Sequence, residues 1–298
     1  QMQLGLRIGI ADSNSHAPVG QDLLSQADFA LERARTIDGA SYQFFAPSMV
    51  ETAKARQELI ADLDAGLRDS EFFIVFQPKI SLRPENDGTL ASAEVLVRWH
   101  HPARGLVGPG KFIPVAESTG LILPLGEFVM MAACRQIRTW IDRHGRSPRL
   151  AVNLSARQFV QNDLCARIET VLRETGVEPH MLEIEVTESA AMQDVEKTAT
   201  ALTELRALGL KISIDDFGTG YSSLNYLRRF QVDAIKIDKS FVDDIETDAN
   251  AKALCNAVIR MGQALSAKVV AEGVESPAQL EFLRQGVQHR RIVRMNRE

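Results

Sequence analysis

The stretch KISIDDFG, residues 211–218, sets two adjacent carboxylates directly after an alternation of apolar and polar residues. This alternation predicts a short strand over residues 211–215. Similar short stretches recur along the chain, and helical patterns long enough to cross over a sheet lie between them. The predicted strands cover residues 72–77, 91–97, 150–153, 182–187, 211–215, 234–237 and 269–272. Strands that alternate with helices in this way predict an α/β protein with a parallel sheet.

A polar side chain stands at or near the end of strand after strand. The set comprises Glu94, Asn153, Glu185, Glu188, Asp215, Asp216, Lys236 and Glu272. In a TIM-like (β/α)8 barrel the carboxyl ends of the strands converge on one face, which is where such barrels place catalytic residues. Carboxylates crowded in this way either take up protons or surround hard cations, and divalent metal is the simpler answer.

The adjacent pair Asp215 and Asp216 suits a two-metal site, in which one carboxylate bridges both ions and its neighbour serves only one. Such a site is used for in-line attack at phosphorus, and Lys236 is placed to orient or polarise the attacking water. Any single acidic residue is also explained as a solvated strand end or a helix N-cap. The whole series at successive strand ends favours a site. A magnesium-dependent lyase with Lys236 as its base is an alternative on chemistry alone.

Six motifs, in order along the chain, resemble the EAL-domain family of cyclic di-GMP phosphodiesterases. They are AEVL at residues 93–96 with Arg98 and Trp99, NLSAR at 153–157, EVTES at 185–189, DDFGTG at 215–220, KID at 236–238 and AEGVE at 271–275. The resemblance runs from about residue 70 to about residue 287. It implies a TIM-like barrel that hydrolyses cyclic di-GMP to linear pGpG with Mg²⁺ or Mn²⁺, two ions per site.

The resemblance also implies a role for each site residue. The implied metal ligands are Glu94, Asn153, Glu185, Asp215, Asp216 and Glu272. The implied catalytic group is Lys236 holding the nucleophilic water, Glu188 anchoring the loop after Asp216, Glu272, and Glu275 supporting the site from behind. The implied substrate contacts are Gln77 against a guanine, Arg98 against a phosphate, Asn153 and Asp216. The forked donors of a guanidinium match phosphate oxygens, which agrees with the implied role of Arg98.

Both ends of the chain differ from the barrel pattern. Residues 1–46 resemble the C-terminal part of a GGDEF domain, through ADFAL at residues 27–31 and a strand near Tyr42, and residues 47–70 predict a connecting helix. We assign the barrel to residues 71–287. Residues 288–298 form an atypical basic tail where the family supplies an eighth strand. We therefore expect a barrel that lacks its closing strand and helix, with unpaired edges on its first and seventh strands.

Composition narrows the classes of function. The chain has 298 residues, 45% hydrophobic and 24% charged, with a net charge of −5, which is typical of a soluble globular protein. The mild acidity argues against binding of a nucleic-acid polymer, and no stretch predicts a membrane span. The cysteines, Cys134, Cys165 and Cys255, are widely spaced and predict free thiols in a reducing compartment, so we expect a cytoplasmic protein.

The leading hypothesis is a cyclic di-GMP phosphodiesterase of bacterial signalling. The alternative is a cyclic di-GMP receptor or scaffold that kept the site and lost turnover because the barrel is incomplete. A diguanylate cyclase is disfavoured, because no GGDEF signature occurs in these residues. The family resemblance further suggests a homodimer formed near the loop after Asp216.

Overall fold

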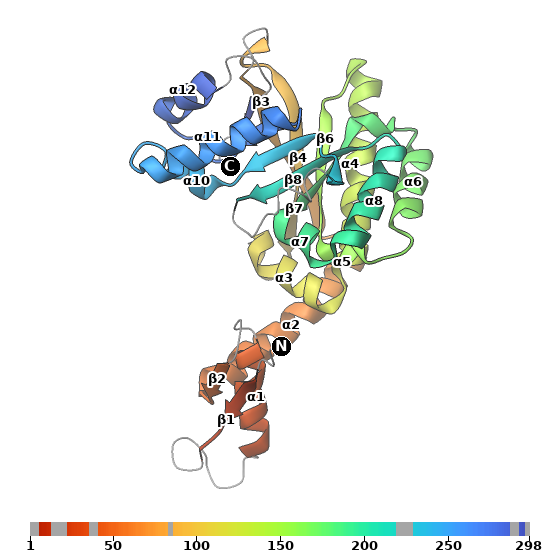
Figure 1. Cartoon of the computed structure of the whole chain (residues 1–298). Coiled ribbons are helices and arrows are strands. Elements are labelled where there is room, and N and C mark those ends of the chain that lie inside the picture. The colour runs from red at the N-terminus through yellow and green to blue at the C-terminus, as the bar shows by residue number, and fades with distance from the viewer. Residues whose placement is uncertain are drawn as a thin grey trace. The chain divides into compact units, whose positions relative to one another are not determined.

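The computed structural model describes residues 6–12, 23–35, 41–82, 86–218, 229–286 and 292–295 (Figure 1). The chain divides into two compact units, residues 1–65 and residues 66–298. Within the part that the structure describes, no helix combines the length and the apolar character needed to cross a membrane.

The first unit contains a helix that packs on two parallel strands. β1 (Arg7–Ile10) pairs with β2 (Ser41–Phe44), and α1 (Leu23–Arg35) lies against both. The contact is closest at Gly9, where a Cβ would lie 2.0 Å from the carbonyl oxygen of Ala27. Only glycine therefore lets this helix approach the strand so closely. α2 (Pro47–Arg68) follows β2, where the sequence predicts a connecting helix.

The second unit is built on one large sheet whose strands mostly alternate with helices. The strands are β3 (Phe72–Ser81), β4 (Leu90–His101), β5 (Gly105–Val107), β6 (Arg149–Leu154), β7 (Leu182–Thr187), β8 (Lys211–Phe217), β9 (Ala234–Ile237), β10 (Lys268–Ala271) and β11 (Ile292–Met295). The helices are α3 (Pro109–Thr119), α4 (Ile122–His144), α5 (Ala156–Phe159), α6 (Leu164–Thr175), α7 (Glu188–Gln193), α8 (Val195–Ala207), α10 (Lys239–Asp243), α11 (Ala249–Ala264) and α12 (Pro277–Gly286). The predicted α/β class is confirmed.

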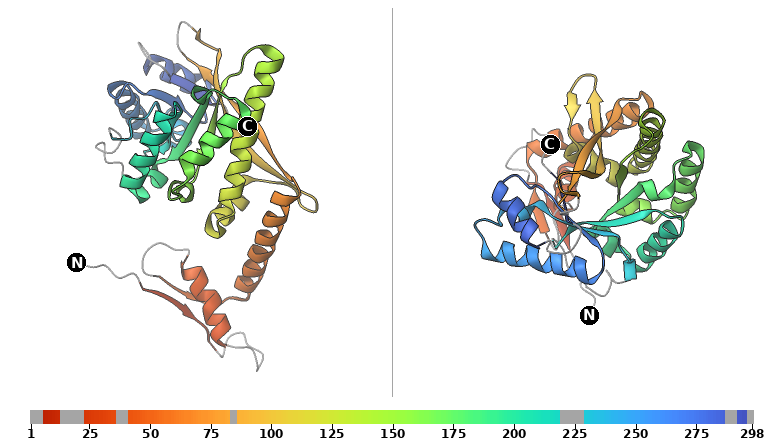
Figure 2. Two further views of the ribbon diagram at one scale, coloured as in Figure 1. Left: turned by 90° about the vertical axis from the view of Figure 1, so that its right-hand side faces the viewer. Right: turned by 90° about the horizontal axis from the view of Figure 1, so that it is seen from above.

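The strand pairings close the sheet on itself as a TIM-like barrel. The order is β3-β11-β10-β9-β8-β7-β6-β4, and β4 pairs back onto β3, while β5 adds to the other edge of β4. Seen from above, the helices lie around the outside of the curled sheet (Figure 2). The barrel therefore brings the carboxyl ends of its parallel strands to one face.

Besides the short edge strand β5, one strand of the closed barrel runs against the predicted parallel arrangement. β3 is antiparallel to both of its neighbours, β4 and β11. The other barrel strands, in the order β4-β6-β7-β8-β9-β10-β11, are each parallel to the next. The reason is the short connection between β3 and β4, which allows a hairpin but is too short for a helical crossover.

The partial barrel that the sequence predicts has a short strand, β11, in the position of the missing eighth strand, so that part of the expectation is corrected, and the missing closing helix stays a prediction. β11 pairs in parallel with β10, Val269 opposite Ile292, and antiparallel with β3, Val293 opposite Ser81. The predicted open edges of the first and seventh strands are therefore covered. The sequence obscures this strand because it is only four residues long and follows two arginines, Arg290 and Arg291.

The strand side chains divide between two environments. On β7 the residues Leu182, Ile184 and Val186 are completely buried in the apolar core, beneath the helices. The alternate residues Glu183 and Glu185 are also buried and face the barrel interior, since successive side chains of a strand point to opposite faces. The barrel therefore has an apolar outer layer and a charged interior.

Removal of β11 tests its role in closing the barrel. A chain ending at Gly286 should unfold about 5 °C lower than the full chain and should associate, because it loses roughly 2 kcal/mol of ladder hydrogen bonds and leaves two strand edges open. Calorimetry with light scattering measures both effects. A chain ending at Met295 keeps β11 and is the control. Equal melting temperatures for the two shortened chains would contradict this role.

Candidate functional site

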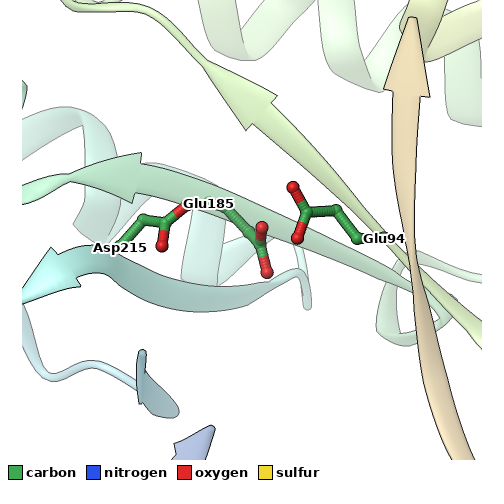
Figure 3. Close-up of side chains that lie close together, drawn as sticks. All are labelled: Glu94, Glu185 and Asp215. Atoms are coloured by element: carbon green, nitrogen blue, oxygen red, sulfur yellow. The ribbon is translucent and has the colours of Figure 1, made fainter. Parts of the chain in front are cut away.

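Seven of the predicted site residues meet at the carboxyl ends of the strands. Glu94 lies in β4, Glu185 in β7, Asp215 in β8 and Lys236 in β9, and Glu272 directly follows β10. Figure 3 shows the carboxylates of Glu94, Glu185 and Asp215 close together. The two remaining members of this cluster are Asn153 at the end of β6 and Asp216 beside Asp215.

A single buried ammonium group lies among the carboxylates. Lys236 is 1% exposed, and its Nζ lies 2.7 Å from Glu272, 2.8 Å from Asp215 and 3.0 Å from both Glu94 and Glu185. These four contacts come from four different strands or strand ends. Lys236 therefore links the strands at this end of the barrel through charge.

The carboxylates differ in how far neighbouring lysines offset the cost of burying their negative charge. Burial and the neighbouring Glu185 raise the pKa of Glu94 to about 7, although Lys236 acts against them. Burial and the neighbouring Asp215 raise the pKa of Asp216 to about 6, and burial raises the pKa of Glu272. The site without metal therefore holds more carboxylates than its cations can keep ionised.

Unlike these three carboxylates, Glu185 and Lys236 both have pKa values that favour their charged forms. Burial acts to raise the pKa of Glu185, but Lys236 and Lys79 outweigh it and lower that pKa to about 2. Burial likewise acts to lower the pKa of Lys236, and its four carboxylates outweigh it and hold the pKa well above the ordinary value. Glu185 is thus a carboxylate and Lys236 an ammonium ion.

Two groups of carboxylates are arranged to hold cations. Glu94, Glu185 and Asp215 form one group, and Asp215, Asp216 and Glu272 form the other, with ligand oxygens within 4.8 Å of one another in each. Asp215 belongs to both, as expected for a bridging carboxylate. Five carboxylates against Lys236 and Lys79 leave three negative charges when all are ionised. Oxygen donors with this excess charge fit hard divalent cations.

The backbone around Asp216 is unusual. Asp216 has a φ of 52°, and its N–H donates to Oδ1 of Asp215 over 2.9 Å. This left-handed conformation is strained for a residue with a side chain. The ladder between β8 and β9 shifts register between Ile214 and Phe217, so the two carboxylates lie in an irregular stretch just before β8 ends at Phe217.

Glu188 forms a hydrogen bond with Gly218, just after the two aspartates. It is the first residue of α7, is 1% exposed, and its Oε2 accepts a hydrogen bond from the N–H of Gly218 over 2.8 Å. Gly218 has a φ of 99°, and a Cβ there would lie 2.9 Å from the ring of Phe241. The predicted anchor for the loop after Asp216 therefore has a partner at the start of that loop. Residues 219–228 lie outside the described residues.

A cavity of about 840 Å³ opens beside the cluster. Arg98, Asn153, Asp215 and Asp216 contribute to its lining, together with Arg157. The Nδ2 of Asn153 donates to Oε1 of Glu94 over 2.7 Å, which connects the lining to the buried carboxylates. A guanidinium on the wall of a cavity of this size is suited to a phosphorylated ligand.

Two predicted residues lie apart from the cluster. Gln77 is half-buried in β3, opposite Glu94 in the strand ladder, and does not belong to the described lining of the cavity. Glu275 is exposed, and its Oε1 lies 3.6 Å from Nζ of Lys239. Their implied roles stay predictions.

Sequence reasoning missed Lys79. This residue of β3 is 1% exposed and forms an ion pair with Glu185 inside the barrel. The available signal was a lysine between Phe76 and Ile80 in a strand that is otherwise largely apolar. A lysine at such a position is buried only when a carboxylate compensates it.

The fold and the site define an α/β barrel with a cluster of carboxylates at the carboxyl ends of its strands that fits divalent cations. The model of the EAL domain matches residues 60–286, and the chain belongs to this family. The predicted resemblance is thereby confirmed for the barrel.

Two curated relatives and one solved structure carry the comparison further. The chain is 41% identical over 283 residues to the "Bifunctional diguanylate cyclase/cyclic di-GMP phosphodiesterase MucR" of Pseudomonas aeruginosa, covering 95% of this chain and 41% of that protein. It is 38% identical over 276 residues to the "Cyclic di-GMP phosphodiesterase PdeR" of Escherichia coli, covering 93% of this chain and 41% of that protein. This chain thus spans about two fifths of these relatives.

The solved structure "PaMucR Phosphodiesterase, c-di-GMP complex" matches with a TM-score of 0.74 at 42% identity, covering 80% of this chain and 94% of that one. Almost the whole of that solved chain is therefore matched by this one.

Replacement of the central ammonium tests the charge balance of the site. In EDTA, Lys236→Met should lower the free energy of unfolding by about 3–5 kcal/mol, because buried carboxylates lose their shared partner. Added Mn²⁺ should raise the melting temperature of this variant more than that of the unaltered chain, since the metal compensates the same carboxylates. Lys197→Met, which removes an exposed ion pair with Asp194 on α8, is the control. An equal Mn²⁺ effect in all three proteins would contradict the prediction.

Proposed function

We propose that this chain hydrolyses one phosphodiester bond of cyclic di-GMP to give linear pGpG, as part of bacterial second-messenger signalling, and that it requires Mg²⁺ or Mn²⁺. The observation that carries the proposal is the pair of carboxylate groups that share Asp215 at the mouth of an EAL-type barrel. The 42% identity to a solved phosphodiesterase in complex with c-di-GMP supports this substrate.

Glu94, Asn153, Glu185, Asp215, Asp216 and Glu272 would hold the cations. When bound, such ions polarise phosphoryl oxygens and lower the pKa of water, which supplies the nucleophile and stabilises developing charge. Hydrolysis of a phosphodiester can therefore use a metal-activated water as the nucleophile and does not require a side chain in that role. The described residues of the cluster offer carboxylates, one amide and one ammonium group.

The other residues bind and orient. Arg98 on the cavity wall would donate to a phosphate of the substrate, with Asn153 and Asp216 beside it, and Gln77 would contact a guanine. The Nζ of Lys236 would hold the attacking water by donating a hydrogen bond. Because the pKa of Lys236 is raised well above its ordinary value by the surrounding carboxylates, this group is poorly suited to accept a proton. The relatives named as cyclic di-GMP phosphodiesterases favour hydrolysis over the lyase alternative.

Glu188 would hold the loop after Asp216 through its bond to Gly218, and Glu275 would support the site from behind. The alternative, a cyclic di-GMP receptor or scaffold without turnover, was based on an incomplete barrel. Because β11 pairs with β10 and β3, a missing strand no longer supports that alternative. Binding without turnover remains an outcome that the first experiment below would reveal.

Three broader inferences accompany the proposed function. We infer that residues 1–46 derive from the C-terminal part of a GGDEF domain, as their sequence resemblance suggests, and that the chain acts in the cytoplasm. We also infer a homodimer formed near the loop after Asp216. Light scattering during size-exclusion chromatography checks the dimer, and a monomer with and without ligand would contradict it.

Hydrolysis of cyclic di-GMP tests the proposed function directly. The purified chain with Mn²⁺ or Mg²⁺ should convert cyclic di-GMP to pGpG, and EDTA should abolish product. Glu94→Ala should lower the rate by at least about 100-fold, because it removes a ligand of the first carboxylate group. Chromatography of the nucleotides measures both rates. If a folded chain binds cyclic di-GMP but gives no pGpG, the receptor alternative holds instead.

The raised pKa values predict how metal binding depends on pH. Metal-free Glu94, with a pKa of about 7, carries a proton below that pH and must release it before it can bind a cation. The affinity for Mn²⁺ should therefore rise with pH, by about tenfold per unit below pH 7, and level off above it. Asp216, with a pKa of about 6, steepens the dependence at lower pH.

Calorimetric titration with Mn²⁺ between pH 5.5 and 8 measures this dependence. Glu94→Gln cannot take up the proton and should show a shallower dependence between pH 6 and 7. An affinity for Mn²⁺ that is constant or falls across this range would contradict the prediction.

A further inference from the structure

Lys79 reaches the metal-ligand cluster from beneath. It lies in β3 and contacts β7, which is not adjacent to β3 in the sheet, so its side chain crosses the barrel interior. The strand ladder between β3 and β4 shifts register between Lys79 and Ile80. Such irregularities re-aim side chains next to functional sites. Lys79 is 1% exposed, so its ammonium group is desolvated in this position.

The two oxygens of Glu185 have different partners. Nζ of Lys79 donates to Oε1, whereas Nζ of Lys236 donates to Oε2 over 3.0 Å. Lys236 also contacts Glu94, Asp215 and Glu272, so Oε2 is the oxygen that faces the cluster. Lys79 occupies the other oxygen and prevents the carboxylate from turning. Glu185 is completely buried, and no solvent can replace this bond.

A second carboxylate and an arginine lie behind Lys79. Nζ of Lys79 is 4.0 Å from Oε1 of Glu183, and Oε2 of Glu183 is 3.7 Å from Nη1 of Arg149. Charges of alternating sign thus run from Arg149 at the start of β6, through Glu183, Lys79 and Glu185, to Lys236. Glu183 and Arg149 line a separate cavity of about 580 Å³ at the amino ends of the strands. The series is anchored away from the substrate cavity.

We propose that Lys79 is a positioning residue: it holds Oε1 of Glu185 and thereby presents Oε2 to the cation held with Glu94 and Asp215. Lys79 does not belong to the described lining of the cavity beside the cluster. The inference rests on the proposed function only in that the cation is the one the reaction would use. Outer partners that orient a ligand commonly change metal affinity by about 10–100-fold, which sets the expected size of the effect.

Direct binding of Mn²⁺ tests the proposal without any nucleotide. The chain is stripped with EDTA, dialysed at pH 7.5 and titrated with Mn²⁺, and the free ion is measured from its electron paramagnetic resonance signal. Lys79→Met should weaken binding of Mn²⁺ by about 10–100-fold, because Oε1 of Glu185 loses its donor. Lys79→Arg keeps a donor at this position and should stay within about threefold of the unaltered chain.

The matched control is Lys211→Met. Lys211 is also a strand lysine paired with a carboxylate, Asp233 at 3.0 Å, and it lines the cavity at the amino ends of the strands. Its removal should change stability but leave the affinity for Mn²⁺ within about threefold. A merely structural role for Lys79 predicts equal Mn²⁺ affinity in the two methionine variants, once each is shown to be folded by circular dichroism.

If Lys79→Met does not fold, Glu183→Gln takes its place. This substitution keeps the shape of Glu183 but weakens its hold on Lys79, and it should weaken Mn²⁺ binding by a smaller factor, about threefold to tenfold. Unchanged or tighter Mn²⁺ binding in Lys79→Met, or in Glu183→Gln where it serves instead, overturns the proposal. If the unaltered chain binds Mn²⁺ but makes no pGpG, while Lys79→Met binds Mn²⁺ more weakly, the proposed function fails and the role of Lys79 stands.

Discussion

The contact of one ammonium group with four carboxylates is the constraint on which the rest of the barrel depends. Lys236 lies within 3.0 Å of oxygens from Glu94, Glu185, Asp215 and Glu272. Such a group forms only where strands distant in sequence end at the same height, because buried charges need partners at hydrogen-bond distance. The curvature of the sheet, its closure through β11 and the irregular stretch of β8 at Asp216 all serve this convergence. The metal-fitting groups of carboxylates are its consequence.

A barrel with a charged interior must obtain its stability elsewhere. The apolar layer between strands and helices supplies it: alternate residues of β7 are fully buried in a core to which α4, α8 and α11 also contribute side chains. Inside the barrel, alternating charges replace the layers of branched apolar side chains that usually fill such a barrel. The same strand period that buries Leu182 and Ile184 outward therefore places Glu183 and Glu185 inward. The core that stabilises the fold and the charged site therefore use opposite faces of the same strands.

The sequence predicted most of this arrangement because alternation and strand-end polarity are local signals. The bounds of β7 and β9 agree with the prediction, and seven predicted site residues meet in one cluster. Two features escaped because they depend on pairing between distant segments. The four residues of β11 are recognisable only between β10 and β3, and the burial of Lys79 only against Glu185 on β7. The antiparallel β3 likewise follows from the length of a connection rather than from its own residues.

The sharing of Asp215 between two groups of carboxylates also limits how this protein can change by mutation. A substitution at Asp215 disturbs both groups at once, and one at Lys236 leaves several acids without a partner, so single steps are costly. Descendants that abandon the chemistry are expected to lose lysine and acids together, through neutralising pairs. The cluster is therefore inherited or lost as a block, and the residues in contact with it are expected to covary in sequence.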